Sequence, residues 1–87
     1  MYVILVYDIG EKRVAKVLKK CRQYLNWIQN SVFEGEISKA NFTKLKSELK
    51  RIINEDEDSI IVFILRTTVY MKREIIGREK LEISNIL

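Results

Sequence analysis

The sequence predicts an α+β fold, a ferredoxin-like split βαβ with an antiparallel sheet and both helices on one face. Two short runs rich in Val and Ile, at 2–7 and 59–66, have the length and composition of buried strands. Two longer segments show the three- and four-residue spacing of half-buried helices. The order strand, helix, strand pair, helix, strand is that of the ferredoxin-like fold, and 87 residues predict one small domain, 1–87.

The first strand is predicted at Tyr2–Tyr7, where six consecutive residues are apolar. A helix should follow from about residue 11 to 25, with basic residues on its outer faces. Its apolar side is formed by Val14, Val17, Leu18, Cys21 and Leu25. Cys21 is the single cysteine, so it has no partner for an internal disulfide, and we expect a buried thiol.

The middle of the chain should contain a strand pair and the second helix. Segment 27–37 mixes aromatic and β-branched residues with Asn30-Ser31 and Gly35, so we expect strand interrupted by a turn, bulge or bend. Ser38 is suited to cap the second helix. Its apolar stripe is Phe42, Leu45, Leu49, Ile52 and Ile53. The acidic segment 54–58 ends this helix, and we expect a solvated loop there.

The last part of the chain has a weaker pattern after the strand at 59–66. Ile75, Ile76 and Gly77 predict a turn into a final strand, Leu81–Leu87, in which apolar and polar residues alternate. The strands at 2–7 and 59–66 are instead apolar on both faces, whereas a sheet with helices on one side should alternate. The second face must be covered, and the simplest cover is the same face of a second copy, in a symmetric dimer.

The charge of the chain is unevenly distributed. Net charge is +4, but between residues 12 and 51 there are eleven Lys or Arg and only three acids. Such a field favours nucleic acid as the partner; the alternative is that these lysines only solvate two helix faces. No run reaches the ~18 apolar residues that span a bilayer, and no signal peptide fits the first strand, so we expect a cytoplasmic protein without membrane contact.

Asp8 is the candidate for chemistry, because an acid ends a buried strand and Gly10 follows two positions later. It could form an Asx turn or cap the next helix. Alternatively, Asp8 and its symmetry mate in a dimer could hold Mg²⁺. Mg²⁺ keeps several waters and takes other ligands from phosphate, so few protein ligands suffice. The chain has no histidine, so any metal must have oxygen ligands.

Six further residues are candidates for contacts with nucleic acid. They are Tyr7, Lys12, Arg13, Lys16, Ser31 and Phe33. The three basic residues begin the basic helix and can reach phosphates that lie across the strand end. The serine can donate to phosphate or form a turn. The two aromatic rings can stack on a ligand or pack in the core.

Four motifs carry a resemblance. They are YDI at 7–9, KRV at 12–14 followed by Lys16, QNSVFEG at 29–35 and DSI at 58–60. Together they resemble the CRISPR-associated protein two family, over essentially the whole chain. The resemblance implies a ferredoxin-like homodimer in spacer acquisition, partnered with the CRISPR integrase, in which Leu81–Leu87 is exchanged onto the edge of the partner protomer's sheet.

Members of that family are also described as Mg²⁺-dependent endonucleases on RNA or DNA. The resemblance implies that Asp8 of each protomer binds Mg²⁺ across the two-fold axis and is the catalytic residue. Trp27 departs from the pattern, since some members have a basic residue there. We therefore expect a dimeric DNA-binding scaffold with a nuclease site. The alternative, an RNA-recognition module without catalysis, fits poorly because the strand at 59–66 lacks the glycine and aromatic consensus of such modules.

Overall fold

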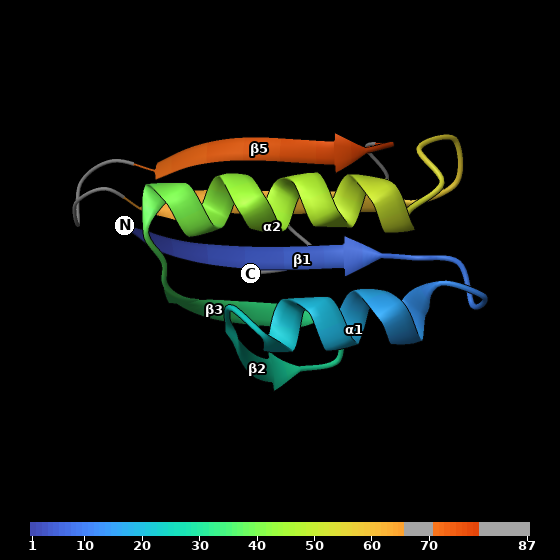
Figure 1. The fold of residues 1–87 in the computed structure, drawn as a ribbon, viewed down its shortest axis with the longest axis horizontal. Helices are drawn as coiled ribbons and strands as arrows, with labels where there is room; N and C mark the ends of the chain where they lie inside the picture. Colours follow the sequence, from blue (N-terminus) through green and yellow to red (C-terminus); the bar gives the residue numbers. More distant parts are fainter. Residues whose placement is uncertain (66–70, 79–87) are drawn as a thin grey trace.

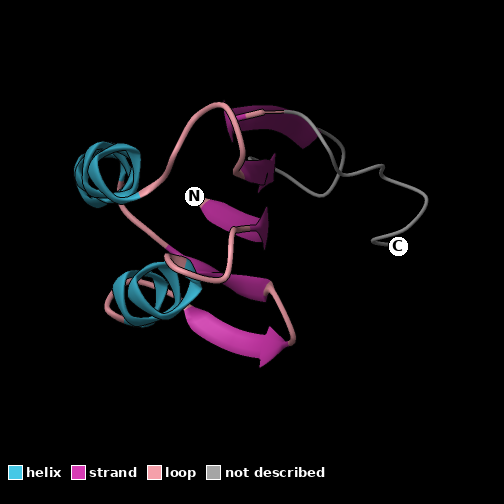
Figure 2. Cartoon of the chain, turned by 90° about the vertical axis from the view of Figure 1, so that its right-hand side faces the viewer, coloured by secondary structure: helices cyan, strands magenta, loops and turns pink. Residues whose placement is uncertain are grey.

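The computed structural model describes residues 1–65 and 71–78, which form a two-layer α+β fold (Figure 1). One antiparallel sheet has the strand order β2-β3-β1-β4-β5. Both helices lie on one face of this sheet (Figure 2), so the predicted fold class is confirmed. The elements are β1 (Tyr2–Asp8), α1 (Val14–Arg22), β2 (Asn26–Gln29), β3 (Val32–Glu36), α2 (Lys39–Ile52), β4 (Ser59–Leu65) and β5 (Met71–Gly77). Among the described residues, no helix is long and apolar enough to cross a membrane.

β1 lies at the centre of the sheet, between β3 and β4. It pairs with β4 from Tyr2 opposite Leu65 to Asp8 opposite Ser59. Val3, Leu5 and Tyr7 point toward the helices and belong to the main core, whereas Val6 belongs to a separate cluster. A strand buried on both faces needs apolar residues at successive positions, which is why the pattern 2–7 is unbroken.

α1 is shorter than the predicted 11–25, because it begins at Val14 and ends at Arg22. Before it, the N–H groups of Arg13 and Val14 both donate to the carbonyl oxygen of Gly10, at 2.9 and 3.1 Å. The N-cap is Arg13, whose side chain makes no capping hydrogen bond. Asp8 is therefore not the cap of α1, and that alternative is wrong. The buried-thiol prediction is confirmed: Cys21 is 0% exposed, and burial raises its pKa to about 12.

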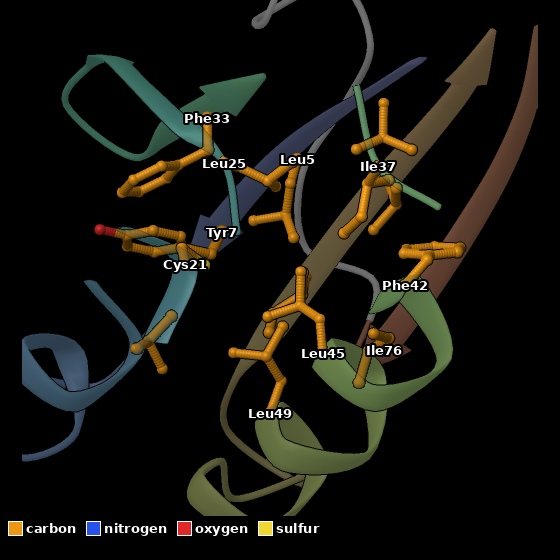
Figure 3. Packing of buried hydrophobic residues seen from close by; sticks show 14 of the residues in the cluster. Leu5, Tyr7, Cys21, Leu25, Phe33, Ile37, Phe42, Leu45, Leu49 and Ile76 are labelled. Carbon is orange, nitrogen blue, oxygen red and sulfur yellow. The ribbon is translucent and has the colours of Figure 1, made fainter. Parts of the chain in front are cut away.

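α2 begins as predicted, since Ser38 is its N-cap and the Ser38 hydroxyl accepts a hydrogen bond from the N–H of Asn41 at 3.1 Å. Phe42, Leu45 and Leu49 on its buried side pack into the main core (Figure 3). The interruption predicted within 27–37 is a turn between β2 and β3, in which Asn30 has a φ of 44°. That left-handed conformation is one that Asn tolerates well.

β5 differs from the prediction. Ile75, Ile76 and Gly77 were expected to form a turn, but they are the last three residues of a strand that pairs with β4 along its whole length. Pairing and burial of Ile76 override a local pattern weakened by three successive charged residues. The predicted final strand, Leu81–Leu87, lies outside the described residues.

The face of the sheet opposite the helices carries the second apolar cluster. Val6, Ile61 and Phe63 form it, and Ile4 and Val32 pack against it at partial burial. Alternation along a strand puts these residues on the side away from the helices. The prediction that both faces of the central strands are apolar is thus confirmed for the described residues.

Candidate functional site

Asp8 is exposed at the last position of β1, opposite Ser59 at the start of β4. Since side chains alternate along a strand, Asp8 shares a face with Ile4 and Val6, away from the helices. This end of β1 is also where the loop to α1 and the loop from α2 to β4 lie (Figure 1, right). Asp8 is therefore an accessible carboxylate at the junction of two loops.

Asp58 is the residue at this junction that sequence analysis missed. Its carboxylate is 0% exposed and accepts four hydrogen bonds. Oδ1 accepts from the N–H of Gly10 at 2.8 Å and from Nη2 of Arg13 at 3.0 Å. Oδ2 accepts from Nε of Arg13 at 2.5 Å and from the N–H of Asn54 at 2.9 Å. The expected solvated loop at 54–58 is thus wrong for Asp58, which is an internal anchor.

The electrostatics of Asp58 follow from these donors. The Arg13 guanidinium holds the pKa of the Asp58 carboxyl well below its usual range, and the N–H groups of Asn54 and Gly10 add to this effect. Burial acts in the opposite direction but does not outweigh the donors. Asp58 is consequently ionised at neutral pH, and it forms two hydrogen bonds with the partly exposed guanidinium of Arg13.

Asp58 fixes the backbone next to Asp8, both along the chain and across the sheet. Gly10 follows Asp8 by two residues, and Ser59, which pairs with Asp8, directly follows Asp58. β5 joins the same junction, because the carbonyl oxygen of Asp58 accepts from the N–H of Arg78 at 2.7 Å. Gly77 has a φ of 90°, and a Cβ there would collide with the Asp58 carbonyl. Only glycine fits this approach.

The predicted phosphate-binding residues fall into two groups. Lys12 and Lys16 are exposed, on the loop before α1 and in its first turn. Ser31 is partly buried, and its carbonyl oxygen accepts from the N–H of Tyr7 at 3.1 Å, so the β2–β3 turn lies beside the end of β1. Arg13 differs from these three, because its guanidinium pairs with Asp58 and, at 2.9 Å, with Glu57. Its position favours a structural task.

Tyr7 and Phe33 lie inside the domain. Their rings stack on each other with centroids 6.1 Å apart, and they are 4% and 0% exposed. Figure 3 shows both rings among the side chains between the sheet and the helices. Of the two alternatives for these residues, burial favours core packing, since neither ring presents an open face to a ligand.

The donor set around Asp8 fits only a loosely held cation. Within residues 1–65 and 71–78, no group of three Asp, Glu, Cys or His side chains could hold a metal ion. Mg²⁺ commonly binds one or two carboxylates and completes its shell with water and phosphate oxygens. Asp8 suits that mode, because it is exposed, its backbone is fixed, and the exposed Lys12 and Lys16 follow it closely in the chain.

Comparison with known proteins agrees with this fold. A sequence model of the family described as CRISPR associated protein Cas2 matches residues 1–73. The chain is 56% identical over its full length to the CRISPR-associated endoribonuclease Cas2 of Dictyoglomus turgidum, also over that protein's full length. It is 51% identical over its full length to the protein of that name from Methanocaldococcus jannaschii, covering 76% of it.

Two solved structures are also similar. A crystal structure of cas2 superimposes with a TM-score of 0.74 at 42% identity, over 95% of both chains. The crystal structure of Streptococcus pyogenes Cas2 superimposes with a TM-score of 0.69 at 38% identity, over 75% of this chain and 86% of that one.

Proposed function

Because this chain belongs to the CRISPR associated protein Cas2 family, we propose that it acts in CRISPR spacer acquisition as a cytoplasmic homodimer. Its main task in this proposal is to hold foreign DNA for the CRISPR integrase. With Mg²⁺ at Asp8, the same dimer is an endonuclease for RNA or DNA. The name endoribonuclease carried by the relatives supports the nuclease part.

The observation that carries the proposal is the contrast between Asp8 and its surroundings. Asp8 is an exposed carboxylate, but the backbone that bears it is fixed by the buried Asp58. A fixed position suits a group that must orient a ligand, because little freedom is lost on binding. The exposed Lys12 and Lys16 supply positive charge for the phosphates that neighbour the one at Asp8.

In this proposal each residue has a separate task. Asp8 would hold Mg²⁺, which when bound polarises a phosphate and makes water more acidic. Lys12 and Lys16 bind neighbouring phosphates and align the strand with Asp8. Arg13 and Asp58 touch no substrate; they keep the loop between β1 and α1 in one conformation.

The homodimer is proposed to form through the face of the sheet opposite the helices. Asp8 lies on this face with the apolar residues Ile4 and Val6, so a two-fold axis there would bring two Asp8 side chains together. The RNA-recognition alternative has less support. The strand at 59–66 lacks the glycine and aromatic consensus that such modules carry.

The test is Asp8→Asn, which keeps the size of the side chain and removes its charge. We expect the rate of Mg²⁺-dependent cleavage to fall by at least about 100-fold. Replacing residues that only hydrogen-bond to metal ligands already lowers metal affinity or activity by about 10- to 100-fold. The free energy of unfolding should hardly change, and spacer integration in cells should persist. Asp56→Asn, the same change at an exposed acid of the 54–58 loop, is the matched control.

Two outcomes would count against the proposal. Cleavage by Asp8→Asn at the rate of the unsubstituted protein would remove the metal role of Asp8. Loss of both cleavage and integration in a fully folded dimer would mean that spacer acquisition depends on the metal site and not only on the DNA-binding scaffold.

A further inference from the structure

α2 carries a stripe of hydrogen-bond donors on its side toward β5 (Figure 1, where the two run side by side). Its members are Thr43, Lys46, Ser47, Lys50 and Arg51. Their spacing of three and four residues puts them on one face of the helix. The opposite wall is formed by Glu74, Ile75 and Ile76 of β5, and the hollow between the walls has a volume of about 620 Å³. We call it the α2–β5 groove.

Positive charge remains in this groove after its internal pairing. Lys46 pairs with Glu74 at 3.1 Å and lies 4.5 Å from the centre of the Phe42 ring. Glu74 is the one acid among the described residues that line the groove, and this pair neutralises it. Lys50 and Arg51 are both exposed in the last turn of α2. The groove therefore presents two cations, with the Ser47 hydroxyl between them and Lys46.

We propose that the α2–β5 groove is a second binding site for the phosphate backbone of nucleic acid, separate from the Asp8 end of the sheet. The stripe from Thr43 to Arg51 extends roughly 12 Å along the helix axis. Within the described chain, its unpaired part, Ser47, Lys50 and Arg51, can contact phosphates of one strand that lies along the groove. Cations and a hydroxyl in a row suit phosphates without reading sequence.

The proposal adds to the proposed function and rests on its nucleic-acid-binding part. An acidic protein segment is the other possible occupant, and exposed Ile75 could contact an apolar side chain of such a segment. Nucleic acid is favoured because most of the lining side chains are donors or cations, whereas Ile75 is the one exposed apolar residue among those that line the groove in the described chain.

The test measures duplex DNA affinity over a series of salt concentrations. We expect Lys50→Gln to reduce the slope of log affinity against log salt by about 0.9, and Lys50→Gln with Arg51→Gln by about 1.8, because each lost phosphate contact releases one counterion fewer. The matched control is Lys44→Gln, an exposed lysine of the same helix. Lys44 precedes Glu48 by one turn, and Glu48 contacts Lys20 of α1 and Tyr24, which follows α1, so Lys44 lies away from the groove.

Three results would overturn the proposal. Equal slopes for Lys44→Gln and Lys50→Gln would mean that only overall charge matters. A normal slope for Lys50→Gln, with a reduced slope for Lys12→Gln/Lys16→Gln, would leave the proposed function intact and remove the groove from it. Loss of polyglutamate binding by Lys50→Gln with unchanged duplex binding would assign the groove to an acidic protein. Failure of the proposed function would give a different result from failure of the groove proposal, because the unsubstituted protein would then bind no duplex DNA.

Discussion

Asp8 and Asp58 lie at the same end of the sheet in opposite environments. Asp8 is exposed, whereas Asp58 is fully buried and accepts four hydrogen bonds. A buried carboxylate is stable only when it is paired and hydrogen-bonded, so Asp58 must organise its surroundings. The exposed carboxylate is the one that an external cation can reach. The two acids therefore differ in their environment: Asp58 is enclosed by its donors, and Asp8 is open to an external group.

Replacing Asp58 should destabilise the domain strongly. Asp58→Ala should lower the free energy of unfolding by roughly 3 kcal/mol, the low end of the range for breaking a buried ion pair. Two backbone N–H groups lose their acceptor, whereas Arg13 is partly exposed and keeps Glu57 as a partner. Urea denaturation measures this. Glu57→Ala is the control, since Glu57 is the exposed partner of the same arginine and should be almost neutral. Equal, small effects of both changes would contradict the anchor role.

The Arg13–Asp58 pair also predicts a pH dependence of stability. The pKa of Asp58 is lower in the folded chain than in the unfolded chain, where it should be about 3.9. Its stabilisation is therefore complete above the unfolded pKa and is lost as the pH falls below about 4, toward the folded pKa. The difference in unfolding free energy between the native protein and Asp58→Asn should stay constant from about pH 7 to 5 and shrink below 4. A difference that does not shrink would mean that Asp58 has the same pKa in the folded and unfolded chain, so that the effect of Asp58→Asn does not come from the lost charge.

At the level of elements, α1 and α2 begin in different ways. α2 has a serine cap, whereas the cap position of α1 is occupied by Arg13, whose side chain is used in a tertiary contact. α1 therefore depends on the loop from α2 to β4 for the position of its first turn. α2 depends on its own sequence at that end.

Loss of the α2 cap should have a moderate and local cost. Ser38→Ala should lower the free energy of unfolding by about 1 kcal/mol, because the N–H of Asn41 loses its acceptor. Ser47→Ala is a suitable comparison, since Ser47 is exposed in the middle of the same helix, where alanine is the better helix former by a few tenths of a kcal/mol. Thermal unfolding of both variants is the measurement. If Ser38→Ala were as stable as Ser47→Ala, the cap would contribute nothing.

At the level of the whole molecule, one sheet separates two kinds of surface. The helix side carries the basic residues of α1 and α2, including the α2–β5 groove. The other side carries the buried apolar cluster of Val6, Ile61 and Phe63, with the exposed Asp8 at its end. A dimer formed through the second side would leave the basic surfaces of both protomers available to nucleic acid.

Removal of Leu81–Leu87 should weaken that dimer. The family resemblance implies that this segment pairs with the partner's sheet, and backbone pairing of an added strand contributes to affinity. Sedimentation at low micromolar concentration should show a dimer for the full chain and a larger monomer fraction for the truncated chain. Circular dichroism of both chains controls for folding. Equally tight association would rule out strand exchange as the basis of the dimer.

The sequence by itself determined the elements that have strong local signals. They are the apolar runs of β1 and β4, the spacing in α1 and α2, and the Ser38 cap, each of which follows from a few neighbouring residues. Between 27 and 37 the sequence predicted an interruption but left open whether it is a turn, a bulge or a bend. Asp8 could be chosen as a candidate because it interrupts an apolar run. β5 could not be found, since its charged residues give no clear period and pairing with β4 decides its structure.

Only the tertiary structure decided which polar residues are internal. Asp58 and Arg13 are 45 positions apart in the chain, and nothing near either residue indicates that they meet. Asp58 stands in an acidic segment whose other members are exposed, and Arg13 stands among exposed lysines. Tyr7 and Phe33 likewise become core residues through their contact across β1 and β3. Burial and pairing depend on groups brought together by the fold, so local sequence determines the strands and helices but not the partners of their side chains.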